Sequence, residues 1–201
     1  GGYGRGELAP FSDLDLLFLI PYKLPPQTEQ TVEFLLYALW DLGLKVGHAV
    51  RSTDDCVRLA NKDLTIRTAL LECRFVAGDA GLLTEMRQRY ADEVMAGTAL
   101  NFVTAKLDER DRRHRRVGDS RYVLEPNIKE GKGGLRDLHT LLWIARYVYR
   151  TRSIADLVKR GTLTPKEGQK FERAANFLWT LRCHLHYLAG RAEETLTFDV
   201  Q

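Results

Sequence analysis

The segment Gly1-Gly2-Tyr3-Gly4-Arg5-Gly6, followed shortly by Ser12-Asp13-Leu14-Asp15-Leu16, carries the strongest signals in this chain. From Asp13 to Ile20 the residues first alternate between polar and apolar and then become continuously apolar, which predicts a strand whose inner part is covered on both faces. Side chains two positions apart on a strand share a face, so Asp13 and Asp15 are expected side by side. Because adjacent carboxylates repel unless a cation lies between them, the pair predicts a divalent metal site.

The glycine-rich start predicts a backbone that approaches phosphate groups closely, with Arg5 adding positive charge. It has no Gly-x-x-x-x-Gly-Lys-Ser/Thr pattern, so it is not a Walker A loop. It leads to a strand, whereas the glycine loop of a Rossmann fold opens a helix. Glycine clusters usually separate elements, so we expect an N-terminally truncated chain that lacks a preceding strand.

Hydrophobic periodicity predicts an α+β chain. A helix is expected from Thr28 or Thr31 to Leu42, ended by Gly43, and then a strand over 44–52, with Ser52 or Thr53 capping the next helix. Further helices are predicted over 62–77, 79–95, 98–116, 137–151 and 164–189, the last starting at Thr164-Pro165. These patterns predict a strand-and-helix domain over 1–97 and an all-helical domain over 98–201.

The composition is that of an ordinary globular chain, with 201 residues, 44% of them hydrophobic, and 30 Lys+Arg against 27 Asp+Glu. It argues against disorder, and a net charge of +3 is too small to indicate nucleic-acid binding by itself. No apolar run approaches the length of a membrane span. Cys56, Cys73 and Cys183 form neither a disulfide framework nor a metal-ligand pattern, which predicts a reducing, cytoplasmic location.

The run from Gly1 to Leu16 resembles the DNA polymerase beta-like nucleotidyltransferase superfamily, which carries Gly-Gly or Gly-Ser before an Asp-x-Asp metal pair. More narrowly, the chain resembles the bifunctional uridylyltransferase/uridylyl-removing enzymes that modify the nitrogen-signalling protein PII. The resemblance covers essentially the whole chain, with further support from Gly47–Ser52, Asp63–Asp79 and, most specifically, Leu124–Leu138. It implies a nucleotidyltransferase mixed sheet with flanking helices and a two-metal transfer of a nucleoside monophosphate.

By this resemblance, Asp13 and Asp15 are the catalytic pair and hold Mg²⁺, with Mn²⁺ as the alternative. Gly1, Gly2 and Ser12 are implied to hold the triphosphate of UTP. The implied acceptor is a tyrosine hydroxyl of PII, and pyrophosphate is the leaving group. Two arginines are added as cationic candidates for nucleotide binding, namely Arg5 and Arg51.

The chain departs from the superfamily pattern in one respect. Many members place a third carboxylate on the strand after the helix, but the strand over 44–52 has no acidic residue. Glu72 and Asp63 are the candidate replacements. His48 on that strand is either a base or phosphate contact, or a partly buried structural histidine, and both readings stay open.

Two later segments also have alternative interpretations. The loop Asn127–Gly134 is either a connector that needs positive φ at several glycines, or a cationic loop whose Lys129, Lys132 and Arg136 reach the nucleotide or the acceptor protein. The segment Lys106–Arg116 is either a solvated helical face or a basic patch for a polyanion.

The resemblance implies two more functions, uridylyl removal by a His-Asp type phosphohydrolase module and glutamine sensing by ACT modules. No His-Asp dipeptide occurs in the sequence, so both functions are expected outside this chain. The expected partners are therefore UTP and PII, without a membrane. The alternatives are a non-catalytic nucleotide-sensing regulatory module, an adenylyltransferase acting on glutamine synthetase, an antibiotic nucleotidyltransferase, and a nucleic-acid binder that uses Lys106–Arg116.

Overall fold

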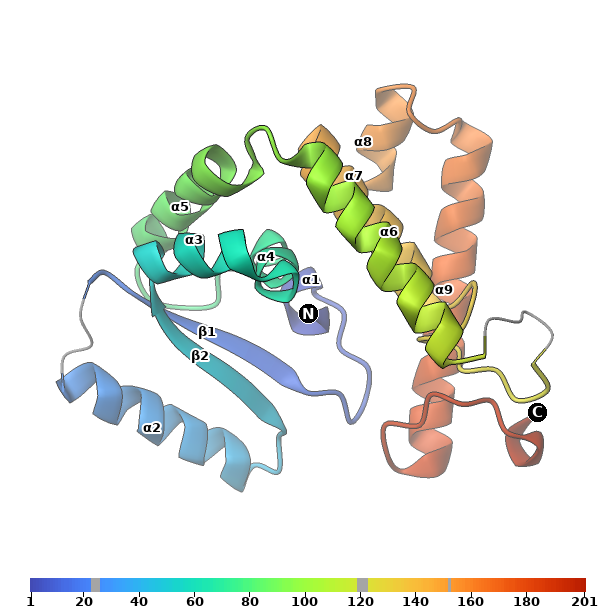
Figure 1. Ribbon diagram of the computed structural model, residues 1–201. Helices are drawn as coiled ribbons and strands as arrows, with labels where there is room; N and C mark the ends of the chain where they lie inside the picture. Colours follow the sequence, from blue (N-terminus) through green and yellow to red (C-terminus); the bar gives the residue numbers. More distant parts are fainter. Residues whose placement is uncertain (23–25, 119–122, 152) are drawn as a thin grey trace. The chain divides into compact units, whose positions relative to one another are not determined.

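A computed structural model describes residues 1–22, 26–118, 123–151 and 153–201 (Figure 1). The chain divides into two compact units, Gly1–Thr98 and Ala99–Gln201. The first unit contains α1 (Gly2–Arg5), β1 (Leu14–Ile20), α2 (Pro26–Asp41), β2 (Val46–Ser52), α3 (Thr53–Lys62), α4 (Leu64–Leu71), α5 (Ala80–Arg89) and the π-helix η1 (Tyr90–Met95). The second contains α6 (Ala99–Arg116), α7 (Leu135–Tyr149), α8 (Ile154–Lys159), α9 (Pro165–Ala189) and the 3-10 helix η2 (Phe198–Val200).

The sheet of the first unit has two parallel strands, β1 and β2. The α+β class is confirmed, but the predicted mixed sheet is not found among the described residues, where the pairing is parallel only. Asp15 pairs with Gly47, Leu16 with His48 and Leu19 with Arg51. The prediction that β1 is covered on both faces is also wrong, because only Leu14 is buried and the following residues are half-buried or exposed.

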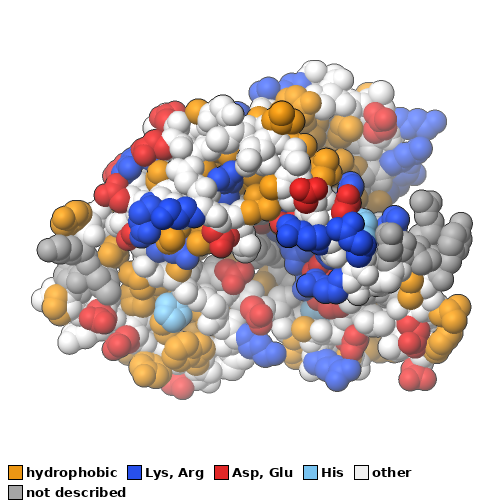
Figure 2. Space-filling view, viewed as in Figure 1, with side chains coloured by type: hydrophobic (Ala, Val, Ile, Leu, Met, Phe, Trp, Pro, Cys, Tyr) orange, Lys and Arg blue, Asp and Glu red, His pale blue; other side chains and the backbone are white. Residues whose placement is uncertain are grey.

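Helices lie on both sides of this strand pair. Figure 1 shows α2 on one side and α1, α3 and α4 on the other. Val32 and Leu36 of α2 are spaced i, i+4 and are both buried, so they form its inner stripe. The outer surface of α2 is apolar as well, with Phe34 71% and Tyr37 62% exposed, and Figure 2 shows hydrophobic side chains over this helix. The chain leaves α2 where Gly43 takes a φ of +76°, at the predicted stop.

The chain breaks between α3 and α4, close to residue 62, where the sequence predicts that a new helix begins. Asp63 has extended backbone angles, and its side chain accepts hydrogen bonds from the amides of Thr65 and Ile66 at 2.6 and 3.0 Å. An N-cap of this kind starts a new helix and ends the previous one. Arg67 fixes the corner, because its buried guanidinium donates to the carbonyl of Ala60 at 2.8 Å. Helix α4 ends at Leu71, earlier than predicted, and Glu72 is its C-terminal cap.

The second unit is built around α7, which contacts both α6 and α9. Phe102 of α6 and Tyr147 of α7 are fully buried and stack with ring centroids 3.8 Å apart. The unit is not purely helical, since an isolated antiparallel bridge joins Asn127 to Thr195. Helix α8 is not predicted by the sequence pattern. Ser153 starts it by accepting a hydrogen bond from the amide of Asp156 at 3.1 Å.

Several predicted helix ends are confirmed. Ser52 caps α3 by accepting from the amide of Asp55 at 3.1 Å. Thr164 caps α9 and forms a reciprocal capping box with Glu167, followed by Pro165 in the first turn. Among the helices that the structure describes, none is both long and apolar enough to cross a lipid bilayer.

Candidate functional site

The carboxylate of Asp15 lies between two glycines. Asp15 is the second residue of β1 and is exposed. A Cβ built on Gly1 would lie 2.5 Å from Asp15 Oδ2, and one built on Gly47 would lie 3.2 Å from Asp15 Oδ1. Any other residue at Gly1 would therefore displace the carboxylate, and one at Gly47 would crowd it. The glycine-rich start and the second strand meet at Asp15 with only backbone beside its oxygens.

Asp13 precedes β1 directly and is also exposed. Among the described residues, neither Asp13 nor Asp15 shares a hydrogen bond or an ion pair with a protein group. The turn before Asp13 is strained, because Phe11 has a φ of +60° and Ser12 closes the turn by donating its amide to the carbonyl of Ala9 at 3.1 Å. Strain of this kind costs about 1–3 kcal/mol and often accompanies functional sites.

The two aspartates fit a hydrated magnesium ion. Mg²⁺ keeps several waters and is commonly bound by one or two carboxylates together with substrate phosphates. Within the described ranges, no cluster of three or more His, Cys, Asp or Glu side chains is placed to hold a metal. A closed structural site needs about four protein ligands, so the pair suits an ion whose coordination is completed by water and phosphate.

The candidates for a third carboxylate have other partners. Asp63 caps α4 through Oδ1, and these amide hydrogen bonds, chiefly that from Ile66, lower the pKa of its carboxyl. The Glu72 side chain is 1% exposed and accepts a 2.7 Å hydrogen bond from Arg5 Nη1. Arg5 also donates to Glu7 at 3.1 Å, so its charge is already paired with two acids. The structure therefore does not bring Glu72 or Asp63 to the aspartate pair as a ligand.

The register places His48 and Arg51 on different faces of the sheet. Paired residues of neighbouring strands share a face, so His48 lies with Leu16 and faces away from Asp15. His48 is exposed and its ring lies 6.5 Å from that of Trp40 in α2. Arg51 shares the face of Asp15 and Gly47, but four residues of strand separate it from Gly47, about 13 Å at ~3.3 Å per residue.

The glycine segment forms the short helix α1, whereas the sequence predicts a loop that leads to a strand. Gly2 is the first residue of this helix and Gly1 precedes it. Gly1 lies beside Asp15, Gly2 faces the carbonyl oxygen of Glu7, and Arg5 points to acidic partners. The predicted site does not include Gly47, which adjoins Asp15, or Arg74, which donates to the carbonyl of Tyr3 in α1. The sequence signals for Gly47 were its place in the segment Gly47–Ser52 that carries the resemblance and a glycine inside a strand, which often marks close backbone approach.

The loop Asn127–Gly134 is tied to its own unit. Lys129 forms an ion pair with Glu194 at 3.2 Å, and Arg136 one with Glu130 at 3.0 Å. Lys132 is exposed. Glu194 is also held by Arg182 at 2.7 Å. Of the glycines in this loop only Gly133 has a positive φ, +80°, rather than the several that were expected of a connector.

The charged end of α6 is solvated on one face, where Asp108, Arg112, Arg115 and Arg116 are exposed, and buried on the other. Lys106, Arg113 and His114 are all buried, at 2%, 6% and 7% exposure. Lys106 Nζ pairs with Glu109 at 2.8 Å and lies 4.3 Å from the Trp143 ring centroid, and burial lowers its pKa. Arg113 and His114 both contact Asp137 of α7. These charges join α6 to α7, so they are not available as a continuous surface for a polyanion.

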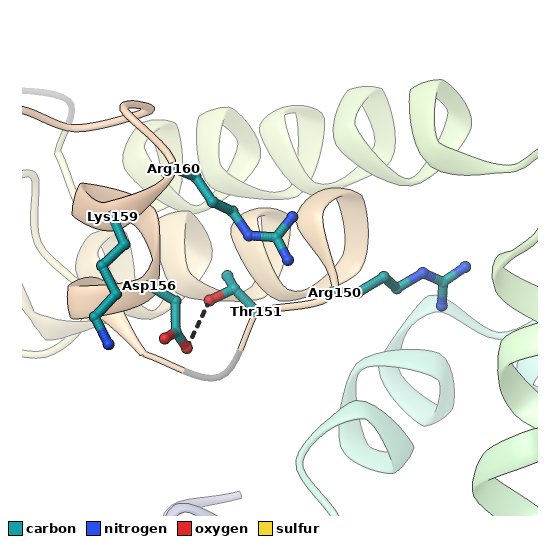
Figure 3. A pocket seen from close by; sticks show the side chains of 5 residues that line it. All are labelled: Arg150, Thr151, Asp156, Lys159 and Arg160. Atoms are coloured by element: carbon teal, nitrogen blue, oxygen red, sulfur yellow. Dashed lines mark hydrogen bonds between the residues drawn. The ribbon is translucent and has the colours of Figure 1, made fainter.

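A hollow of about 400 Å³ lies at the end of α7 and along α8 (Figure 3). Its lining residues are Arg150, Thr151, Asp156, Lys159 and Arg160. The Thr151 hydroxyl donates to Asp156 Oδ2 at 3.1 Å, which links two of the lining residues. None of the predicted site residues lines it.

These features define an α+β protein in which an exposed aspartate pair lies against a glycine-rich helix. A family model described as GlnD PII-uridylyltransferase matches residues 101–201, and the chain belongs to this family. Over all 201 residues the chain is 64% identical to a relative from Azospirillum brasilense, 63% to one from Rhodospirillum rubrum and 58% to one from Rhodopseudomonas palustris. Each is named a bifunctional uridylyltransferase/uridylyl-removing enzyme, and the chain spans 22% of the length of each.

Proposed function

We propose that this chain carries the site at which UMP is transferred from UTP to a tyrosine of a PII protein, with release of pyrophosphate, in nitrogen-status signalling. The observation that carries the proposal is the 64% identity over all 201 residues of the chain to a relative named as a bifunctional uridylyltransferase/uridylyl-removing enzyme. The backbone-lined carboxylate of Asp15 supports it, because a phosphate-bearing ligand needs such access.

In this reaction the tyrosine oxygen attacks the α-phosphorus of UTP, the bond from that phosphorus to the bridging oxygen of pyrophosphate breaks, and the phenolic proton passes to water. Asp13 and Asp15 would hold Mg²⁺, which when bound neutralises phosphate charge and favours in-line attack. Gly1, which lies beside Asp15, and Gly2 would let the backbone approach the triphosphate. Catalysis of this kind is mainly positioning and charge compensation.

Two alternatives share the same residues and differ in outcome. A non-catalytic sensing module binds nucleotide without transfer. An adenylyltransferase uses ATP and modifies glutamine synthetase. The names of the relatives favour uridylylation over both. We place uridylyl removal and glutamine sensing in the parts of these proteins that the chain does not span. The three free thiols support a reducing, cytoplasmic location.

The test measures incorporation of labelled UMP into PII. The enzyme in this assay is a full-length protein, as long as the relatives, that contains this chain. Asp13→Asn and Asp15→Asn each remove a charge from the metal pair. We expect each to reduce transfer about 1,000-fold, since several kcal/mol of charge stabilisation is lost at ~1.4 kcal/mol per tenfold. Asp41→Asn, an exposed aspartate at the end of α2, is the matched control. Nucleotide binding without transfer, or wild-type rates in either site variant, would contradict the proposal.

A further inference from the structure

The loop that follows α4, Glu72–Arg74, contacts the glycine-rich helix α1 through two of its side chains. Glu72 accepts a 2.7 Å hydrogen bond from Arg5 Nη1, and the two side chains are 1% and 7% exposed. Arg74 donates to the carbonyl of Tyr3 from Nη2 at 3.1 Å, and its guanidinium lies 4.8 Å from the Tyr3 ring centroid. Residues distant in sequence therefore hold both the backbone and the charged side chain of α1.

The backbone contact between the two segments is equally close. The carbonyl oxygen of Glu72 occupies the space into which a Cβ on Gly4 would point, so α1 packs here only because residue 4 is glycine. The loop is held from behind by Arg87 of α5, which donates to the carbonyl of Cys73 at 2.6 Å. Helix α1 is thus attached to α4 and α5. Gly1, the residue that precedes α1, lies against Asp15 Oδ2.

The ion pair between Arg5 and Glu72 argues against two simpler roles for these residues. An arginine that binds triphosphate must turn its guanidinium to the ligand, which would break a 2.7 Å ion pair with a carboxylate whose side chain is 1% exposed. Removing one partner of a buried pair is strongly unfavourable because the other charge stays desolvated. Likewise, Glu72 Oε2 cannot ligate a metal without giving up the hydrogen bond from Arg5.

We propose that Arg5 and Glu72 are positioning residues, which hold α1 so that the glycine backbone and the Asp15 carboxylate keep a fixed separation. The inference rests on the proposed nucleotidyl transfer, whose triphosphate would lie on that backbone. It assigns the motif Glu72–Arg74 a function that does not include metal binding. It also removes Arg5 from the predicted nucleotide ligands.

The first test is Glu72→Gln, which keeps the shape and an acceptor oxygen but removes the charge. Because a displacement of about 1 Å costs about 100-fold, we expect kcat/KM for UTP to fall about 100-fold. The loss should fall mainly on KM, because α1 would hold the triphosphate before and during transfer. The Mg²⁺ dependence at saturating UTP should not move. Glu7→Gln is the matched control, since Glu7 also contacts Arg5 but its side chain is 50% exposed.

The second test is a double-mutant cycle with Arg5→Gln. If Arg5 acts through Glu72, adding Arg5→Gln to Glu72→Gln causes almost no further loss. Equal losses in both backgrounds would show direct phosphate binding by Arg5 and overturn the proposal. A raised Mg²⁺ requirement in Glu72→Gln would show a metal ligand and overturn it as well.

Hydrogen exchange separates this proposal from the proposed function. The amides of Arg5 and Gly6 bond to the carbonyls of Gly1 and Tyr3 at 3.3 and 3.1 Å, so they report whether α1 is intact. Faster exchange there in Glu72→Gln, with the rest of the unit unchanged, supports the positioning role even if the wild type transfers no UMP. Unchanged exchange contradicts it. If Glu72→Gln does not fold, Arg5→Lys, which keeps the charge, serves in the same measurement.

Discussion

Replacing Gly1 or Gly47 by alanine places a methyl group against one oxygen of Asp15 and leaves all charges in place. The two substitutions approach the carboxylate from different segments and to different extents. The added Cβ would lie 2.5 Å from Oδ2 at Gly1 and 3.2 Å from Oδ1 at Gly47. They therefore form a graded series in which only the displacement of Asp15 varies.

The magnitudes follow from these separations. An ordinary contact begins at 3.4 Å, so the carboxylate must move by 3.4 − 2.5 = 0.9 Å for Gly1→Ala and by 3.4 − 3.2 = 0.2 Å for Gly47→Ala. With a cost of about 100-fold per 1 Å of misplacement, we expect roughly 60- to 100-fold loss of transfer for Gly1→Ala and roughly 2- to 3-fold for Gly47→Ala.

The assay is the initial rate of labelled UMP incorporation into PII as a function of Mg²⁺, with thermal unfolding of each variant as the control for folding. In an Asp15→Asn background neither alanine should cause a further loss, because the group it displaces no longer contributes. Wild-type transfer by Gly1→Ala, or a larger loss for Gly47→Ala than for Gly1→Ala, would refute the geometry on which the site is built.

Three further predictions concern stability and reactivity. Burial raises the pKa of Glu194, but hydrogen bonds and charge from Arg182 and Lys129 outweigh burial, so the pKa is lowered. The stability that Glu194 contributes is therefore present above its ordinary pKa of 4.5 and is lost as the pH falls through the lower pKa of the folded state. Glu194→Gln should lower the free energy of unfolding in urea by about 3 kcal/mol at pH 7 and flatten its dependence on acid pH, and an unchanged pH dependence would contradict this prediction. Cys56 is fully buried and burial raises its pKa to about 11, so iodoacetamide at pH 8 should label it only after unfolding; rapid labelling of the native protein would show the burial to be wrong. Thr164→Ala removes the capping box of α9 and should lower stability by about 1 kcal/mol, measured as a lower midpoint of thermal unfolding, whereas an unchanged midpoint would mean that the cap is not formed.

Local sequence patterns predicted the elements that depend on neighbouring residues. The end of α2 at Gly43 and the start of α9 at Thr164 are capping events within a few residues, so both could be predicted. The strand after Asp13 and the α+β class follow from alternation and apolar runs. The helix predicted over 62–77 does begin near residue 62, where Asp63 caps it, but its early end at Leu71 was missed because apolar residues continue to Phe75 and Val76.

The sequence by itself determined that glycines precede an aspartate pair on a strand, because that motif needs only spacing and side-chain chemistry. Tertiary structure decided which groups meet. The parallel register set Gly47 beside Asp15 and turned His48 to the other face, and a single-residue slip would have reversed both. Packing of the α4 end on α1 paired Arg5 with Glu72. Such pairings join residues far apart in the chain, and burial fixes them because a desolvated charge needs a partner.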